Sequence, residues 1–364
     1  MDLEFLQPLY EADGPVASVH LDTTRSSHDA EKQIELRWRA ARRSLAEQGA
    51  DEETLAALDE VVGGVADVPG PQGEALFASG GRVLGAFTLA EPPASDSALV
   101  LPVADPLGLA VDRDHQLPHV VVAVDREGGD VYAYPAAAHE ESYRRTFNGS
   151  TLHITRVKAG KEAQKSYHRR SVQVWSENTG QAADGVREAA ADVDAAVVLV
   201  AGDPKAIGLL REHLTDRPPH GRIVYVEGGR TDDSAREGLR ESADEAIREA
   251  MEAAHREVLD RLEAETAGGR ALQGIPAVQQ ALTEGRVETL LLSADRSGDP
   301  DLYASRTDPQ LLGTDPAELG DASALFSAPA GTLLLRAAAL SGANFTELLP
   351  PVSATDGVAA LLRY

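Results

Sequence analysis

The first part of the chain alternates short apolar strands with amphipathic helices. Residues 15–22 alternate apolar and polar side chains and include β-branched residues, which predicts a strand. Apolar residues then recur at spacings of three and four over residues 34–45, the pattern of a helix with one buried face. Residues 74–78 and 82–89 are joined by Ser-Gly-Gly and are expected to form a hairpin. A Pro-rich connection follows, so we predict a first α/β domain over residues 1–118.

The middle of the chain has longer apolar runs. Residues 120–124 are apolar throughout, and a glycine pair separates them from a second predicted strand at residues 130–134. A buried strand at residues 195–200, a helix at residues 205–214 and one further strand follow. Strand, helix and strand in this order favour a parallel sheet that is covered by helices. We therefore predict a central α/β domain over residues 119–232.

The last part of the chain opens with a long charged helix. Residues 234–266 place Leu, Val and Ala on one face and Glu and Arg on the other, and a glycine pair ends the pattern. A helix at residues 276–283 and a strand at residues 287–293 follow, before a polar insertion at residues 295–320 that has no strong periodicity. We predict a third domain over residues 233–364.

The end of the chain is expected to complete a small α/β sandwich. Apolar runs at residues 332–336 and 358–362 predict two strands, with a helix near residues 337–341 between them. The predicted fold class is thus α/β, with three domains that each combine a mixed or parallel sheet with helices.

Positive charge is concentrated in one stretch, residues 143–170. The chain has a formal net charge of −25, yet this stretch holds eight basic residues against one acid, Glu162, and contains three of the five lysines. Such a surface suits phosphate, and the acidity of the rest of the chain argues against a general nucleic-acid coat. The basic residues of the stretch are Arg144, Arg145, Arg156, Lys158, Lys161, Lys165, Arg169 and Arg170.

The residue types of this basic stretch suit contact with RNA. Lys and Arg side chains contact phosphate oxygens without reading bases, and Gly160 lets the backbone approach another molecule closely. His168, together with Tyr167 and Phe147, has the flat ring that stacks on unpaired bases. A second interpretation stays open, in which the aromatic side chains belong to a core and the basic side chains form a solvated face.

Several classes of functional site lack their parts in this sequence. It contains no cysteine, no Walker loop, no GxGxxG after a strand, no HExxH and no GxSxG, so we expect neither a cofactor nor a metal ion. No apolar run is long enough to span a membrane, and the first residues lack the features of a signal peptide. We therefore expect a cytoplasmic protein without a membrane partner.

Three stretches and the order of the predicted domains carry a family resemblance. The stretches are residues 281–293 (ALTEGRVETLLLS), 356–364 (DGVAALLRY) and 34–43 (IELRWRAARR). Over essentially the whole chain, the sequence resembles the bacterial branch of the archaeal and eukaryotic release factor and Pelota superfamily, which includes Balon-type ribosome hibernation factors and their actinobacterial relatives. The resemblance implies a three-domain release-factor-like architecture, with the first domain toward the decoding centre and the basic loop near the peptidyl-transferase centre.

Two motifs of that superfamily are missing. Its release factors carry Gly-Gly-Gln on the second-domain loop, whereas this chain has no such triplet and residues 159–164 (AGKEAQ) stand at the corresponding place. The Asn-Ile-Lys-Ser loop that reads stop codons is also absent, and residues 23–27 (TTRSS) occupy the nearest position. The resemblance therefore implies a hibernation or stress factor that occupies the ribosomal A site, contacts ribosomal RNA and does not release the peptide. It also adds Gln164 to the predicted RNA-binding residues and elongation factor Tu as a candidate partner of a monomeric protein.

Two other functions stay open. In an enzyme of the same shape, Gln164 would position water or a tRNA hydroxyl for hydrolysis of peptidyl-tRNA or for cleavage of the tRNA end. Alternatively, the protein is a ribosome-independent scaffold that kept the fold and lost the site. In that case, reversing the charges of Lys158, Lys161 and Lys165 would leave the binding of the protein unchanged.

Overall fold

The computed structural model describes residues 1–64, 70–125, 127–136, 143–148, 179–308, 310–320 and 324–364 of the chain. The chain forms two compact units. One, the terminal unit, combines Met1–His115 with His255–Tyr364, and the other, the central unit, spans Gln116–Ala254. The division into three domains over residues 1–118, 119–232 and 233–364 stays a prediction.

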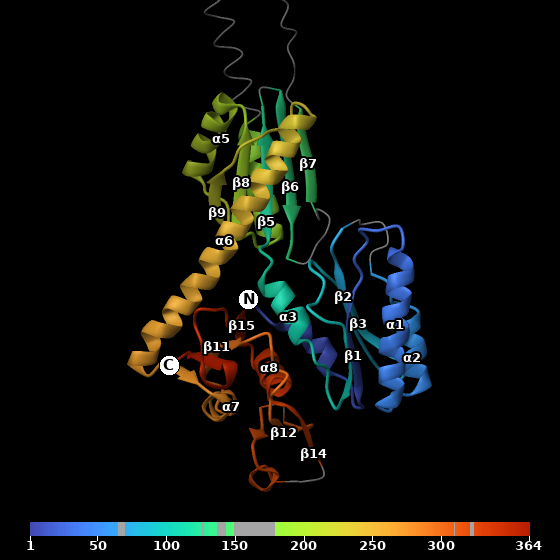
Figure 1. Ribbon diagram of the computed structural model, residues 1–364. Coiled ribbons are helices and arrows are strands. Elements are labelled where there is room, and N and C mark those ends of the chain that lie inside the picture. Colours follow the sequence, from blue (N-terminus) through green and yellow to red (C-terminus); the bar gives the residue numbers. More distant parts are fainter. Residues whose placement is uncertain (65–69, 126, 137–142, 149–178, 309, 321–323) are drawn as a thin grey trace, which may run out of the picture. The chain divides into compact units, whose positions relative to one another are not determined.

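The terminal unit begins with an antiparallel four-stranded sheet of order β3-β2-β1-β4. Two helices cover one face of this sheet, where Trp38 and Leu45 pack with Val19 of β1 (Figure 1). The predicted first strand, helix and hairpin are confirmed. The elements of this part are η1 (Glu4–Tyr10), β1 (Val16–Asp22), α1 (Ala30–Glu47), α2 (Glu52–Asp59), β2 (Gly73–Ser79), β3 (Arg82–Leu89), β4 (Ser97–Leu101) and α3 (Leu107–Asp114).

The second half of the terminal unit contains two further sheets, of order β10-β16-β11-β15 and β13-β12-β14. In the first of these, β15 runs parallel to β11 and the other pairs are antiparallel. Its elements are β10 (Ala271–Gln273), α7 (Ile275–Thr283), β11 (Val287–Leu292), β12 (Asp301–Ser305), β13 (Leu312–Gly313), η2 (Pro316–Glu318), β14 (Leu325–Pro329), α8 (Ala330–Leu340), β15 (Asn344–Glu347), η4 (Thr355–Gly357) and β16 (Val358–Leu362).

One hydrophobic core joins the two halves of the terminal unit. It contains Leu6 and Phe77 from the first part of the chain and Leu290, Leu334 and Phe345 from the last part, all of which are fully buried. Because apolar area removed from water is the main favourable term in folding, these contacts bind the two distant chain segments into one body.

A buried polar cluster also holds this unit together. Oδ2 of Asp114 accepts hydrogen bonds from Nε2 of His255 (2.9 Å) and from the backbone N–H of Glu347 (2.7 Å). Next to it, Nε2 of His115 lies 2.5 Å from Oε2 of Glu347, and this contact raises the pKa of His115 although partial burial opposes the charge. The residues come from the C-terminal end of α3, from α6 (Asp233–Gly268) and from the end of β15, so the cluster fastens three elements at one place.

The predicted strand at residues 332–336 is wrong, because these residues lie inside α8 (Ala330–Leu340). Every residue of this helix except its last is buried, so no polar face gives the pattern a helical period. The predicted helix at residues 337–341 is the second half of α8. The segment at residues 295–320 that showed no periodicity contains the short strands β12 and β13, and α3 lies in the stretch that was expected to be a connection.

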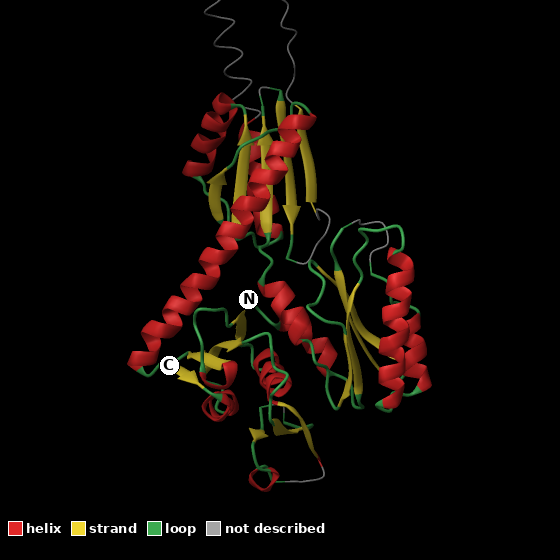
Figure 2. Ribbon diagram, in the orientation of Figure 1, coloured by secondary structure: helices red, strands yellow, loops and turns green. Residues whose placement is uncertain are grey.

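The central unit is a five-stranded sheet of order β7-β6-β5-β8-β9 (Figure 2). The strand β5 runs parallel to β8, which runs parallel to β9, while β6 is antiparallel to both β5 and β7. The predicted strands and helix of this part are confirmed, and the parallel pairing is limited to three strands. The bounds are β5 (His119–Val124), β6 (Gly128–Tyr134), β7 (Tyr143–Asn148), β8 (Val197–Gly202), α5 (Pro204–Asp216) and β9 (Arg222–Tyr225).

Helices cover both faces of the central sheet. Alternate residues of β5 and β8, such as Val122 and Val200, face α5 and the helical residues 179–192. The intervening residues, such as Val121 and Leu199, pack against the first part of α6 (Asp233–Gly268). Burial on both faces explains why these strands are apolar throughout rather than alternating. The α/β class predicted from the sequence is therefore confirmed.

Candidate RNA-binding site on the central sheet

The described residues include the beginning of the predicted RNA-binding stretch. Arg144 and Arg145 lie on β7, where their backbones pair with Tyr132 and Val131 of β6. The other predicted members, Arg156, Lys158, Gly160, Lys161, Gln164, Lys165, His168, Arg169 and Arg170, lie outside the described residues. The structure therefore places two of the predicted residues on an edge strand, and the role of the whole set stays a prediction.

The strand directions show where the basic stretch leaves the sheet. Asn148, the last residue of β7, pairs with Gly128, and the end of β5 at Val124 pairs with Gly202 at the end of β8. All three strands end at the same edge, here called the carboxyl edge of the central sheet. In open α/β sheets, ligands bind outside this edge.

The chain also re-enters the described structure at the carboxyl edge. The helical residues 179–192 begin there, since a Cβ placed on Gly129 would lie 3.7 Å from Cβ of Ala182. Residues 148 and 179 are thus both anchored beside the β5–β6 turn. The described residues on either side of residues 149–178 are therefore both held at the carboxyl edge of the central sheet.

A salt-bridge network fastens this edge. Nε of Arg230 donates to Oδ2 of Asp130 (2.7 Å), and its Nη1 donates to Oδ1 of Asp125 (3.1 Å). Asp125 Oδ1 also accepts the backbone N–H groups of Glu127 and Gly128, which closes the β5–β6 turn. Burial by itself would lower the pKa of Arg230, but the contacts with the two carboxylates outweigh it and raise the pKa. The guanidinium therefore ties the segment after β9 to the turn between β5 and β6.

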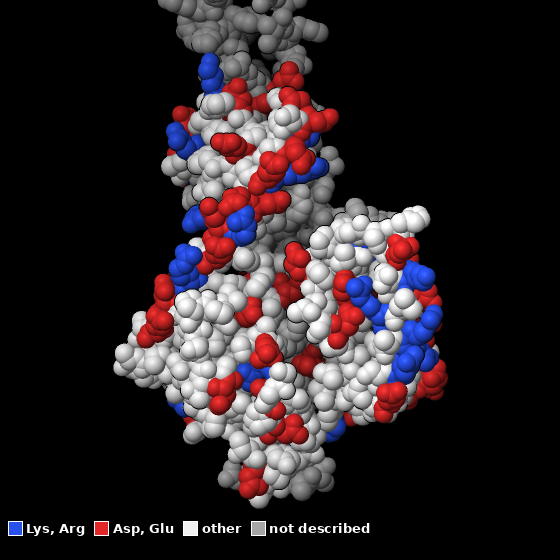
Figure 3. Space-filling view, in the orientation of Figure 1, with Lys and Arg blue, Asp and Glu red and all other residues white. Residues whose placement is uncertain are grey.

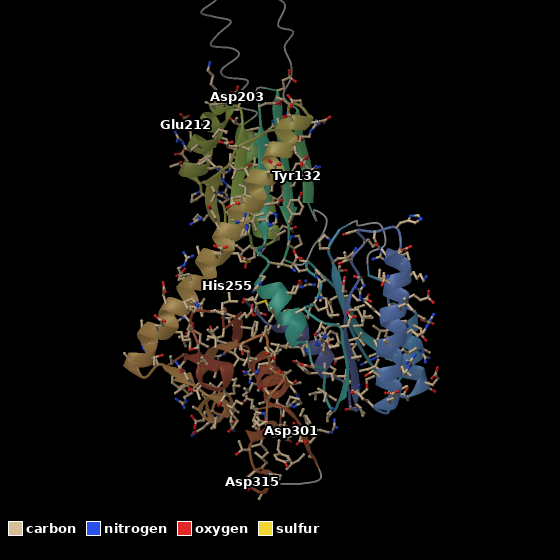
Figure 4. All side chains as sticks on the ribbon, viewed as in Figure 1. Tyr132, Asp203, Glu212, His255, Asp301 and Asp315 are labelled. Carbon is tan, nitrogen blue, oxygen red and sulfur yellow. The ribbon has the colours of Figure 1, made fainter. Side chains whose placement is uncertain are left out.

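The end of β8 is packed closely against β5. Gly202 has a φ of +128°, and a Cβ at this position would lie 1.8 Å from the carbonyl oxygen of Val124, so only glycine fits. Asp203 follows, donates its backbone N–H to Val124 and accepts at its side chain from the N–H groups of Lys205 and Ala206, which begins α5. Figure 4 shows Asp203 at this end of the central unit.

The chemistry of the described edge is acidic rather than basic. It presents the carboxylates of Asp125, Asp130 and Asp203, with Arg230 engaged by two of them. Carboxylates at this position attract a cationic segment and repel phosphate. Within the central unit, contact with RNA phosphates is therefore expected from the basic stretch rather than from this edge.

Sequence reasoning missed Arg230, Asp125 and Asp130. The side chains of Arg230 and Asp130 are separated by 100 residues in the sequence and meet only when the sheet forms. Asp125 could have been found, since it directly follows an apolar strand and parallel strands share their carboxyl ends at one edge. Arg230 has no comparable signal.

Two features of the described residues bear on membrane insertion and on metal binding. No helix in this part of the chain combines the length and the hydropathy that crossing a bilayer requires. No group of three or more His, Asp or Glu side chains in the same part of the chain is arranged to hold a metal ion.

Comparison with known proteins gives one family match and several distant relatives. Residues 118–268 match the model of bacterial archaeo-eukaryotic release factor family 2. An uncharacterized protein of Mycobacterium tuberculosis, Rv2629, is 28% identical over 381 residues, which cover 100% of this chain and 97% of the relative. The protein MT2704 of a second strain matches with the same values. This family match supports, over residues 118–268, the release-factor-like family recognised in the sequence.

The solved structures that resemble this chain are more distant in sequence. Archaeal Pelota, from a model of ribosome-bound Pelota and ABCE1, is 15% identical in sequence. The match covers 100% of this chain and 94% of Pelota, with a TM-score of 0.41. Dom34 of S. cerevisiae, described as a translation termination-like factor, is 10% identical, with 80% of this chain and 79% of Dom34 covered and a TM-score of 0.40. Scores at this level carry no argument about function.

Proposed function

Because residues 118–268 match the model of bacterial archaeo-eukaryotic release factor family 2, we propose that this protein is a translation factor that binds the ribosome. One observation carries the proposal. The matched part encloses the stretch 143–170, which gathers eight basic residues in a chain of net charge −25. The most basic part of an acidic chain thus lies within its release-factor-like part, where contact with RNA phosphates is expected.

The structure of the central unit supports a local and oriented contact. Residues 148 and 179, which flank the greater part of the basic stretch, lie at the carboxyl edge of the central sheet, and Arg230 with Asp125 and Asp130 fastens this edge. The acidic edge repels phosphate, so the basic stretch is the part of this unit that contacts ribosomal RNA. Its contact residues in this proposal are Arg144, Arg145, Arg156, Lys158, Gly160, Lys161, Gln164, Lys165, His168, Arg169 and Arg170.

The finer part of the proposal concerns the outcome of binding. The sequence has neither Gly-Gly-Gln nor Asn-Ile-Lys-Ser, so the protein occupies the A site without reading a stop codon and without releasing the peptide. This behaviour suits a hibernation factor, with elongation factor Tu as the candidate GTPase partner. Gln164 then contributes to contact rather than to hydrolysis.

Co-sedimentation with ribosomes across a salt series tests the proposal. Wild-type protein should bind, and the variant Lys158→Glu, Lys161→Glu, Lys165→Glu should lose binding, because these side chains supply phosphate contacts. Each lost contact should also reduce the slope of log affinity against log salt by about 0.7–0.9 in magnitude. A matched control reverses Arg236, Arg240 and Arg248 on α6, which are exposed and paired only with neighbouring acids. The control has the same net charge as the test variant and should bind like wild type.

Two results would overturn the proposal. One is that wild-type protein fails to bind ribosomes with and without elongation factor Tu and GTP. The other is that the control variant loses binding as strongly as the test variant, since the effect would then reflect net charge alone. A separate variant, Gln164→Ala, removes one uncharged contact among eleven and should keep most of its affinity, whereas measurable hydrolysis of peptidyl-tRNA that disappears in this variant would favour an enzyme.

A further inference from the structure

The outer face of α1 in the terminal unit carries a row of exposed basic side chains. Ile34, Trp38, Ala41 and Leu45 form the buried face of this helix. On the opposite face, Lys32, Leu36, Arg39 and Arg43 follow one another at spacings of four, three and four residues, so they lie along one line. These four residues, all exposed, are here called the basic stripe. Figure 3 shows Lys and Arg gathered over the region of α1 and α2, with Asp and Glu among them.

The other arginines of α1 are engaged in holding the helix in place. Nη2 of Arg37 lies 2.7 Å from Oδ2 of Asp22 on β1. Arg42 pairs with Asp59 (3.1 Å) and Glu52 (2.5 Å) of α2. These pairs balance the charge on the two flanks of the helix. Among the described residues, the cations of the basic stripe form no ion pair with β1 or α2.

The cations of the basic stripe are available to a partner. Among the described residues, Lys32 and Arg43 have no hydrogen-bond or ion-pair partner. Arg39 pairs with Glu35 (2.6 Å), but the two side chains are 59% and 65% exposed, and such a pair contributes at most about 1 kcal/mol. Phosphate can therefore replace Glu35 at little cost. Leu36 lies between these cations and is 45% exposed, which is high for a large apolar side chain.

We propose that the basic stripe binds the phosphate backbone of a double-helical segment of RNA. From Lys32 to Arg43 the stripe extends about 16 Å at 1.5 Å per residue. A nucleic-acid duplex has a dense row of phosphates, with roughly one charge per 1.7 Å of the axis in DNA, so phosphates lie within reach along the whole stripe while Leu36 faces the sugars. Lys and Arg on a straight helix contact phosphates without reading sequence. The choice of RNA rests on the proposed function, and the stripe would be a second RNA contact besides the stretch 143–170.

An anionic membrane is the less suitable partner for this face. A helix that lies in a membrane interface needs a broad apolar face, and α1 uses its apolar face in the core of the terminal unit. Leu36 is the one large apolar side chain of the stripe. The stripe thus has the charge that phosphates require and lacks the apolar area that acyl chains require.

The test uses the full chain with Lys32→Glu, Arg39→Glu and Arg43→Glu. The first probe is an RNA duplex of about 20 base pairs and mixed sequence, titrated by fluorescence anisotropy at several salt concentrations. The variant should bind at least about tenfold more weakly, and its slope of log affinity against log salt should be smaller by about 2–3, one contact per lost cation. The milder variant with Gln at the three positions should give an intermediate loss. The α6 control, Arg236→Glu, Arg240→Glu, Arg248→Glu, should change the affinity less than about threefold.

Ribosome co-sedimentation separates this inference from the proposed function. If wild type and the stripe variant bind ribosomes and the duplex equally well, the stripe inference is overturned and the proposed function stands. If wild type fails to bind ribosomes but the duplex binds only through the stripe, the proposed function falls and the phosphate-binding stripe remains. Binding to vesicles of phosphatidylserine and phosphatidylcholine without binding to the duplex would also overturn the inference. Unchanged circular dichroism and thermal unfolding confirm that the variants are folded.

Discussion

The two compact units differ in what they bury. The terminal unit encloses many polar side chains, among them His20, Asp114, His255, Arg336 and Glu347. In the described part of the central unit, Thr179 is the one polar side chain that is buried to the same degree, and the core consists of Val, Ala, Leu and Ile. Buried polar groups favour packings that give them partners, and burial of titratable groups ties stability to their ionisation. We therefore expect the terminal unit to be sensitive to pH and to polar substitutions, and the central unit to be much less so.

Asp114→Ala should cause the largest loss of stability. The substitution removes the acceptor for Nε2 of His255 and for the N–H of Glu347, and it leaves both donors buried without a partner, at a cost of about 3–5 kcal/mol. Hydrogen exchange read by mass spectrometry should show faster exchange in β15 and α3. Peptides of β5 and β8 should keep wild-type rates. The exposed control Asp260→Ala on α6 should change neither unit, and equal loosening of both units by Asp114→Ala would contradict the comparison.

His20 should make the terminal unit less stable in acid. Burial lowers the pKa of His20 to about 4, so between this value and the unfolded pKa near 6.5 the unfolded chain binds more protons than the folded chain. The free energy of unfolding therefore falls as pH decreases through this window, by up to about 3 kcal/mol in total.

Denaturant unfolding at several pH values, followed by hydrogen exchange in β1, measures this dependence. The difference between wild type and His20→Leu should change with pH between 6.5 and 4, because the variant has no group that titrates at this position. Gln33→Leu on α1, an exposed position without a titratable group, serves as the control and should leave the pH dependence unchanged. A pH-independent difference for His20→Leu would show that the imidazole is not excluded from protonation by the fold.

Arg230→Ala should have a smaller effect that is confined to the central unit. It breaks two partly exposed ion pairs at the carboxyl edge, with an expected cost of about 1–2 kcal/mol. Exchange should accelerate in the β5–β6 turn. Arg222→Ala on the edge strand β9, an exposed site without a described ion pair, is the matched control. If Arg230→Ala also weakens ribosome binding more than Arg222→Ala does, the edge positions the basic stretch, as the proposed function expects.

Arg39→Ala should change stability least, by less than about 0.5 kcal/mol, because its ion pair with Glu35 is exposed. Thermal unfolding of Arg39→Ala, Glu35→Ala and the double variant measures the pair directly. A coupling energy well above 1 kcal/mol would mean that Glu35 holds Arg39 too firmly for phosphate to replace it. That result would weaken the argument for the basic stripe as well.

The parts of the fold with a clear period could be predicted from the sequence, and the others could not. The buried strand β5 and the amphipathic helix α1 follow directly from their apolar residues. The first half of α8 was predicted as a strand because the helix is buried on all sides, and a short apolar run fits a strand as well as a helix. Helix α3 is short and follows Pro106, so it resembles a connection.

The candidate sites show the same limit. The concentration of charge in residues 143–170 is a property of composition and is visible in the sequence, although its contacts stay a prediction. The basic side chains of α1 could also be located on the helix. Which of them remain free could not be predicted, because Arg37 and Arg42 find their partners on β1 and α2 only when the elements pack.

The shared core of the terminal unit has a consequence for how the protein is made. Leu6 and Phe77 emerge early during synthesis, but Leu334 and Phe345, which cover them, are added only after the whole central unit has been translated. At about 5–20 residues per second, the early segment waits for roughly ten seconds to a minute with part of its apolar surface uncovered. The central unit, whose core residues are contiguous in the chain, is able to fold during this time. The nascent terminal unit is thus the part that a chaperone would be expected to protect.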